Sequence, residues 1–457
     1  MSGAALPKLA LGFVAAAIVA LYAHAIFYTP IAYGDQFQEI HRTFTWSLSQ
    51  YLSSYMAGQG PLFRPGEIVL RYVILYGFGG DPFAYNYFQI LYLALTAIMA
   101  LSLVPCRNWA DAGAAITALA FLFGHHAYVA VMEANITFSN GLVLLLMLVV
   151  LHVLQAKGSL TTQILAIALS LAAVLTKEVG LIVPVALASG ALLGFPGVRR
   201  STAILLVALI LAYVGYRLAT LPPFEGEMGA STPHTFAERL SNMIAAPVMI
   251  VTGDPFDGEW SQFLSRHLYP WRIIRIALGL ATIIVILAAY LLRKRAAEAF
   301  PDQELVDGKW MLLLLIVGAA SSAIAFQYTR HRFGAMVLPV AFLLLDRSLR
   351  ILIWRLSRID VAAWARVAAV SLLFAFSLGW ATRAADGFVV LRNIGAKIMI
   401  DWIEHWQEYR AYEGRDPGTL PYLDASFWAA EEMPWPTVRD DWPFVKFWLG
   451  DEDVMNR

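Results

Sequence analysis

Long apolar segments separated by short polar ones recur along the whole chain. Each is close to the roughly 20 residues that a helix needs to cross about 30 Å of hydrocarbon. The pattern predicts eleven membrane-spanning helices, at residues 9–28, 84–104, 112–130, 139–156, 160–176, 180–196, 201–220, 272–292, 310–327, 333–350 and 363–383. The first has no strongly basic start and no obvious cleavage site, so we expect it to be retained as a helix.

Two segments between the first and second predicted spans have a different pattern. Residues 37–57 place apolar side chains such as Phe37, Phe44 and Leu48 on one helical face, which predicts a helix lying in the membrane interface. Residues 67–78 are too short to span, so we expect a second surface helix there. Near the other end, residues 384–457 are more polar and rich in Trp, Pro and acids, which predicts a small tail domain.

The composition agrees with a chain whose solvent is partly lipid. Hydrophobic residues make up 59% of the sequence and charged residues 14%, and the mean hydropathy is +0.62. A formal net charge of zero argues against a nucleic-acid partner. The single cysteine, Cys106, excludes an internal disulfide. The chain has no Walker, dinucleotide, HExxH or GxSxG motif, so nothing indicates nucleotide hydrolysis or serine chemistry.

Basic residues gather in alternate loops, which predicts the orientation. The loops on the predicted inner side hold Lys8, Arg107, Lys157, Arg199, Arg200, Arg293, Lys294, Arg295, Lys309, Arg347, Arg350, Arg355, Arg358 and Arg366. We therefore expect an all-α, polytopic transmembrane bundle of residues 1–383 with a cytoplasmic N-terminus. Its outer loops would be 29–83 and 221–271, and residues 384–457 would form an extracytoplasmic tail domain.

Four cations depart from this distribution, because they lie at the outer ends of predicted spans. They are Arg64, Lys177, Arg330 and Arg332. A cation in such a position either reaches lipid headgroups or binds an anion, and guanidinium suits phosphate. Acids and histidines accompany them at the same depth: Glu67, His125, His126, Glu133 and Glu178. The balance of charge suits a phosphate held beside a catalytic acid.

Asp35, in the stretch "AYGDQFQEIHR" (32–42), is the candidate for that acid. It is a solvated loop acid, or it caps the helix predicted at 37–57, or it acts as a general base on an incoming hydroxyl. The other candidates have structural alternatives too. Lys177 and Glu178 would neutralise each other, and Arg330 and Arg332 would contact headgroups. The two histidines and Glu133 lack the spacing of a zinc site and would be hydrogen-bonding, substrate or plain loop residues.

Two longer stretches carry a family resemblance. "LFRPGEIVLRYVILYGFGGDPFAYNYFQILYLAL" (62–95) and "FLFGHHAYVAVMEANITFSNGLVLLL" (121–146) are similar to runs in the GT-C glycosyltransferases. The branch with protein O-mannosyltransferases and their tetratricopeptide-bearing relatives is the most similar. The resemblance covers residues 28–200 well and 325–340 loosely. Gly66 stands where these enzymes usually have Leu, His126 where they tend to have Pro, and Asp35 is one acid where many have a pair.

The resemblance implies an integral membrane glycosyltransferase that uses a polyprenyl-phosphate-linked sugar. Asp35 would deprotonate an acceptor hydroxyl, which then attacks the sugar with inversion. Arg64, Lys177, Arg330 and Arg332 would stabilise the departing phosphate. The acceptor would be a lipid, a glycan or a protein. The site would face the periplasmic or extracellular side of a bacterial inner membrane. No cofactor or metal is indicated, although the part of a divalent ion at Asp35 stays open.

Two other functions remain open at this point. A transporter or flippase for a lipid-linked glycan would use the cations only to guide a headgroup, and it should show internal repeats with broken mid-membrane helices. We find no convincing repeat. A non-catalytic scaffold whose tail binds a partner would leave the outer charges without a role. Neither the sugar nor the acceptor follows from the sequence.

Overall fold

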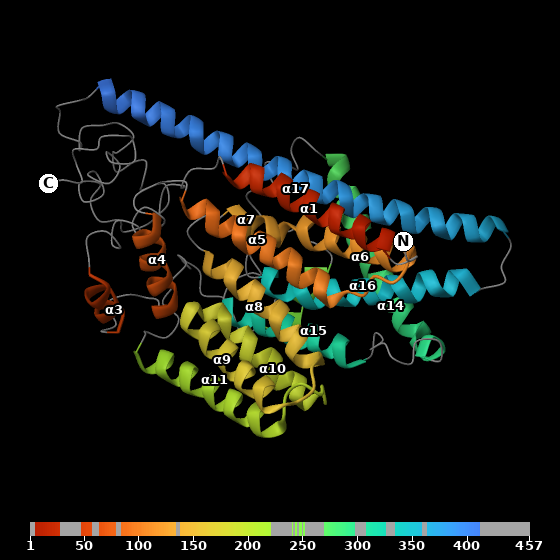
Figure 1. Ribbon diagram of the computed structural model, residues 1–457, viewed down its shortest axis with the longest axis horizontal. Helices are drawn as coiled ribbons and strands as arrows, with labels where there is room; N and C mark the ends of the chain where they lie inside the picture. Colours follow the sequence, from red (N-terminus) through yellow and green to blue (C-terminus); the bar gives the residue numbers. More distant parts are fainter. Residues whose placement is uncertain are drawn as a thin grey trace.

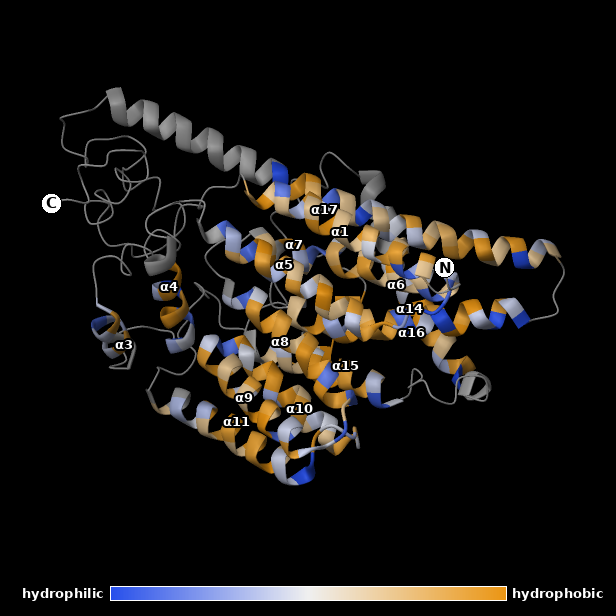
Figure 2. Cartoon of the chain, viewed as in Figure 1, coloured by the Kyte–Doolittle hydropathy of each residue, from blue (hydrophilic) through white to orange (hydrophobic). Residues whose placement is uncertain are grey.

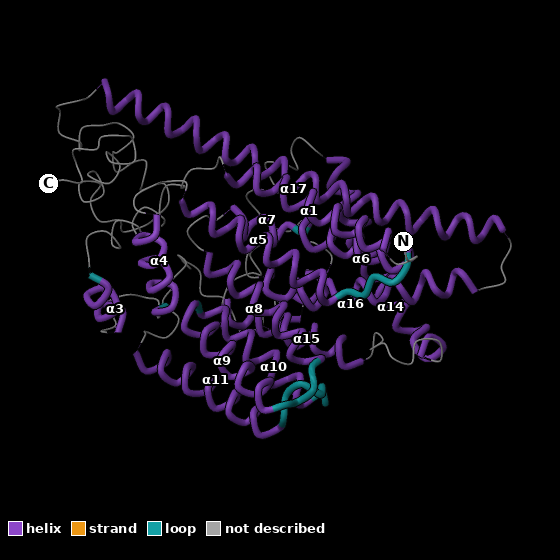
Figure 3. Tube along the Cα trace, in the orientation of Figure 1, coloured by secondary structure: helices purple, strands orange, loops and turns teal. Residues whose placement is uncertain are grey.

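The chain is built from helices, which confirms the predicted all-α class. The computed structural model describes residues 5–27, 47–56, 64–78, 84–133, 138–220, 240, 243–244, 246–248, 250–251, 269–297, 308–325, 334–358 and 363–411. These described ranges contain helices joined by short loops and no strand (Figure 3). The helices are α1 (Ala5–Phe27), α3 (Leu48–Met56), α4 (Pro65–Phe78), α5 (Ala84–Leu103), α6 (Trp109–Gly124), α7 (His126–Glu133), α8 (Phe138–Gln155), α9 (Leu160–Thr176), α10 (Ile182–Leu192), α11 (Arg200–Thr220), α14 (Tyr269–Ala297), α15 (Gly308–Ala325), α16 (Leu338–Arg358) and α17 (Ala363–Ala411), with short 3-10 turns η1 (Glu178–Leu181) and η2 (Gly334–Val337).

Most of the long helices run along a common direction, while α3 and α4 lie together at one end of the bundle (Figure 1). Tyr51 of α3 packs against Ile68 and Tyr72 of α4, and α4 in turn packs on α9. Along one side, α17 lies against α1 and α6. The two short helices thus lie over the helix ends. Residues 37–46 and 57 of the first predicted surface helix lie outside the described part of the chain, and a position in the membrane interface stays a prediction for both helices.

The loops that carry many of the basic residues meet at the opposite end. Arg347 donates a hydrogen bond from Nη2 to Oε1 of Gln155 at 3.2 Å, and Arg199 donates from Nε to the carbonyl of Gly158 at 2.9 Å. Helix α9 separates this basic end from the end that carries Arg64, and its 17 residues span about 26 Å at 1.5 Å per residue.

Three helices are long and apolar enough to cross a membrane: Ala5–Phe27, Asn86–Leu103 and Ala363–Arg392. Seven shorter apolar helices of 10–17 residues accompany them in the described ranges. Large hydrophobic side chains are exposed on their outer faces, for example Phe13 at 75% and Trp364 at 76%. Apolar residues dominate these helices, whereas hydrophilic residues gather toward their ends (Figure 2). An apolar surface of this kind suits contact with lipid. The full count of eleven spans stays a prediction.

The span predicted at 112–130 is interrupted. Helix α6 ends at Gly124, where a Cβ would lie 2.6 Å from the backbone nitrogen of Ala384 in α17. His125 then adopts an extended conformation, and its Nδ1 accepts a hydrogen bond from the N–H of Ala127 at 3.0 Å. The side chain thereby caps the short helix α7. Hydrophobicity alone misses this break, because both halves are apolar.

Two other predicted spans begin as tight turns. Residues 180–196 contain part of η1 and then α10, which ends at Leu192, ahead of Gly194 with its positive φ of 79°. Residues 333–350 contain η2 and then α16, which continues to Arg358.

The boundary predicted at residues 383/384 falls inside a helix. Helix α17 continues without a break from Ala363 to Ala411. The change in composition near residue 384 therefore does not coincide with a helix end, and the tail domain itself stays a prediction. Residues 412–457 lie outside the described part of the chain.

Candidate functional site

Arg64 directly precedes α4, and the sequence around it starts the helix. Pro65 occupies the first helical position, where its missing N–H costs nothing. Glu67 lies in the first turn, where a carboxylate interacts favourably with the helix dipole. The carbonyl of Arg64 accepts the first backbone hydrogen bond, from Ile68, at 3.1 Å. The "FRPGE" stretch therefore fixes the position of the Arg64 backbone.

Gly66 brings this helix start against the end of α9. A Cβ at position 66 would lie 3.0 Å from the carbonyl oxygen of Leu175 and 3.2 Å from the nitrogen of Thr176. These are backbone atoms that a larger residue would have to displace. The absence of a side chain at Gly66 thus permits a close contact, which sets Arg64 beside Glu178.

We expect Gly66→Ala to destabilise the protein by about 1–3 kcal/mol, because the added methyl group overpacks this contact. Gly12→Ala is the matched control, since nothing lies within 4 Å of a Cβ there. Alanine also favours a helix by about 1 kcal/mol over glycine. Thermal unfolding of both variants in detergent measures the difference. Equal melting temperatures for the two variants would contradict the close contact.

Arg64 is held by two acids. Its Nε lies 3.1 Å from both carboxylate oxygens of Glu178, and its Nη2 donates to Oε2 of Glu178 at 3.0 Å. On the other side, Nη1 lies 3.7 Å from Oε2 of Glu67. Arg71, one turn further along α4, donates from Nη2 to Oε1 of Glu67 at 2.6 Å. The Arg64 side chain is 13% exposed and the Glu67 side chain 1%. This largely buried network holds the guanidinium of Arg64 in a defined position.

Lys177 completes the charged cluster. It follows the last residue of α9, is 3% exposed, and interacts electrostatically with Glu67. Burial alone would raise the pKa of Glu67, but the charges of Arg71, Arg64 and Lys177 outweigh burial and hold that pKa below its usual value. Glu67 is therefore negative at neutral pH. Counted by formal charge among the described residues, Arg64, Arg71 and Lys177 against Glu67 and Glu178 leave the Arg64 cluster with one positive charge in excess.

His125 has both ring nitrogens engaged. Besides the bond from Ala127 to Nδ1, its Nε2 lies 2.8 Å from the carbonyl of Ile250, so Nε2 carries the proton and donates it. His125 therefore links the junction of α6 and α7 to the backbone of residue 250. His126 is partly buried at the start of α7. Glu133 ends α7, and its side chain lies outside the described part of the chain.

Asp35, Arg330 and Arg332 also lie outside the described residues. Of the predicted site, the structure therefore brings together Arg64, Glu67, Lys177 and Glu178. It adds Arg71, which the sequence analysis overlooked. The signal for Arg71 was available: an acid and an arginine four residues apart, at positions 67 and 71 of a predicted helix, form a pair on one face.

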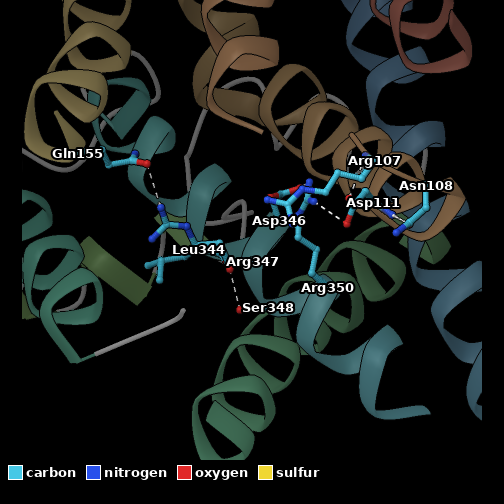
Figure 4. Close-up of polar contacts among 9 residues, drawn as sticks. All are labelled: Arg107, Asn108, Asp111, Gln155, Leu344, Asp346, Arg347, Ser348 and Arg350. Atoms are coloured by element: carbon cyan, nitrogen blue, oxygen red, sulfur yellow. Dashed lines mark hydrogen bonds and ion pairs between the residues drawn. The ribbon is translucent and has the colours of Figure 1, made fainter. Parts of the chain in front are cut away.

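A second buried charge cluster lies at the basic end of the bundle (Figure 4). Arg350 of α16 donates to Asp346 through Nε and Nη2, both at 2.8 Å, and its Nη1 lies 2.7 Å from Oδ1 of Asp111. Asp111 accepts from the backbone N–H of Arg107 at 3.0 Å, and its own N–H donates to Asn108. The cluster joins α6 to α16. Arg350 was predicted only to carry an inner-loop charge, and its buried partners were not predicted.

The described residues include no group of three or more His, Cys, Asp or Glu side chains placed to hold a metal ion. A scan against protein-family models, a search of curated proteins and a search of solved structures each found no match to this chain.

Proposed function

We propose that the chain is a membrane glycosyltransferase. It moves a sugar from a polyprenyl-phosphate-linked donor to an acceptor hydroxyl at the end of the bundle that carries Arg64. This end faces the outside of a bacterial inner membrane, because the basic loops at the other end favour the cytoplasm. The observation that carries the proposal is the Arg64 cluster, whose cations are held in place by buried acids.

The charge of the cluster matches this donor. A polyprenyl-phosphate sugar is a phosphodiester with one negative charge, and the described part of the cluster has one positive charge in excess. In the reaction the acceptor oxygen bonds to the anomeric carbon, the bond from that carbon to the phosphate oxygen breaks, and Asp35 takes the acceptor proton. The leaving phosphate gains a second negative charge. Arg64 and Lys177, already positioned by Glu67 and Glu178, stabilise that developing charge.

The test is transfer by the full chain reconstituted in vesicles. The probe is undecaprenyl phosphate carrying a ³H-labelled hexose, with membranes of the expression host supplying acceptors. Because a sugar phosphodiester is labile in mild acid and a glycoside is not, the assay measures label that becomes stable to mild acid. Protein-dependent formation of such label is the expected result.

Two outcomes contradict the proposal. Label that crosses the bilayer but stays acid-labile would identify the flippase instead. Label that neither crosses the bilayer nor becomes stable to acid would favour the non-catalytic scaffold instead.

A further inference from the structure

Two loops lie side by side at the basic end of the bundle. One connects α8 to α9, and the other, at residues 193–199, connects α10 to α11 (Figure 3). The N–H of Gly197 donates to the carbonyl of Leu154 at 3.2 Å, and a Cβ on Gly197 would overlap the carbonyl oxygen of Val153. Only glycine therefore fits at this point, and the two loops form one compact surface.

Arg199, at the end of the second loop, is fixed in this surface by Gln163 of α9. Gln163 is 5% exposed; its Nε2 donates to the carbonyl of Gly197 at 2.9 Å, and its Oε1 accepts from the N–H of Arg199 at 2.9 Å. The Arg199 side chain itself donates through Nε to the carbonyl of Gly158 at 2.9 Å. The exposed guanidinium is thus held in place, while its two Nη groups have no partner among the described residues.

Arg200 follows directly and begins α11. It is exposed, and no carboxylate of the described residues pairs with it or with Arg199. The four helices that adjoin the two loops, α8, α9, α10 and α11, contain no acid. Within the described part of the chain, the two adjacent arginines therefore present uncompensated positive charge to an anion from outside the protein.

An apolar surface begins directly beside the two arginines. Ile204 lies one turn after Arg200 on the same face of α11 and is 70% exposed, and its neighbour Leu205 is 59% exposed. Leu192, the last residue of α10, is 79% exposed. A water-soluble phosphate ester would contact the arginines but not this apolar surface, whereas a phospholipid would contact both.

We propose that Arg199 and Arg200 bind the phosphate of an anionic phospholipid, whose acyl chains lie on the exposed apolar residues of α11 and of the end of α10. Guanidinium groups suit this role because they bind phosphate oxygens through two parallel hydrogen bonds. A zwitterionic headgroup is disfavoured, since its ammonium group would add a positive charge beside the two arginines. The site lies at the opposite end of the bundle from Arg64, so the inference is independent of the proposed function.

The test is lipid binding by the full chain in a neutral detergent, measured by native mass spectrometry. The probes are dioleoylphosphatidylglycerol, dioleoylphosphatidylcholine and the water-soluble headgroup glycerophosphoglycerol. We expect the wild-type protein to bind the anionic lipid about 10-fold or more tightly than either of the other two probes. Equal affinity for the two lipids would overturn the proposal. Equal affinity for the anionic lipid and its headgroup would overturn it too, because the acyl chains would then make no contribution.

Arg200→Gln should weaken binding of phosphatidylglycerol by about 10-fold. It should leave the melting temperature unchanged, because no described hydrogen bond or ion pair of the Arg200 side chain is lost. Lys8→Gln is the matched control, since it removes an exposed cation near the start of α1, outside both loops, and it should bind the lipid like the wild type. If Lys8→Gln weakens binding as much as Arg200→Gln, the lipid responds only to the overall positive charge of the chain, and the proposed site is overturned.

Discussion

An Asp35→Asn variant is expected to transfer sugar about 10²–10⁴-fold more slowly than the wild type, the contribution typical of a general base. Asparagine has nearly the same size as aspartate but cannot accept the proton of the acceptor hydroxyl. The variant should fold and bind the lipid donor normally, because the donor phosphate is held by other residues. The measurement is the initial rate of formation of acid-stable label at saturating donor.

Glu39→Gln is the matched control for this variant, since it neutralises an acid four residues further along the same loop. It should retain the wild-type rate. If Asp35→Asn also retains that rate, Asp35 has no part in the chemistry, and its carboxylate is a loop acid or a helix cap instead.

Arg350→Met is expected to lower the stability of the protein by about 3–5 kcal/mol. Arg350 is 6% exposed and is paired with two acids, of which Asp346 is 0% exposed. Removing the guanidinium leaves these carboxylates buried without their counter-charge. The measurement is the free energy of unfolding of the purified protein in detergent, with unfolding induced by heat or by denaturant.

Two further variants distinguish the loss of the buried ion pairs of Arg350 from the loss of an arginine elsewhere in α16. Arg355→Met changes a partly buried arginine of the same helix and should have little effect. Adding Asp346→Leu to Arg350→Met should recover part of the lost stability, because one unpaired charge is removed. If Arg350→Met is as stable as Arg355→Met, the cluster does not hold α6 and α16 together.

Hydrophobic periodicity predicted helix positions well and helix ends less well. The segment predicted at 160–176 coincides with α9, since Ser159 caps its start, with Oγ accepting from Thr162, and the chain leaves the helix at Lys177. The break at His125 was missed because it depends on contacts distant in sequence, with Ala384 and Ile250. The length of α17 was also missed, because a polar helix and a polar tail have similar composition.

The candidate site was predicted in part because charge at a span end is visible in the sequence. Arg64, Lys177 and Glu178 were singled out for that reason, and the structure brings them together. The pairing of Arg64 with an acid was not predictable, since the contact between Arg64 and Glu178 joins residues 114 positions apart.

Binding of undecaprenyl phosphate to the full chain tests most directly whether the Arg64 cluster holds the donor phosphate. Lys177→Met removes a buried cation of the cluster, whereas Lys157→Met removes an exposed lysine at the basic end. Lys177→Met is expected to weaken binding by about 10-fold or more, the size typical of a charge-assisted contact, whereas Lys157→Met is expected to bind like the wild type. Equal affinities for Lys177→Met and Lys157→Met would contradict this role of the Arg64 cluster.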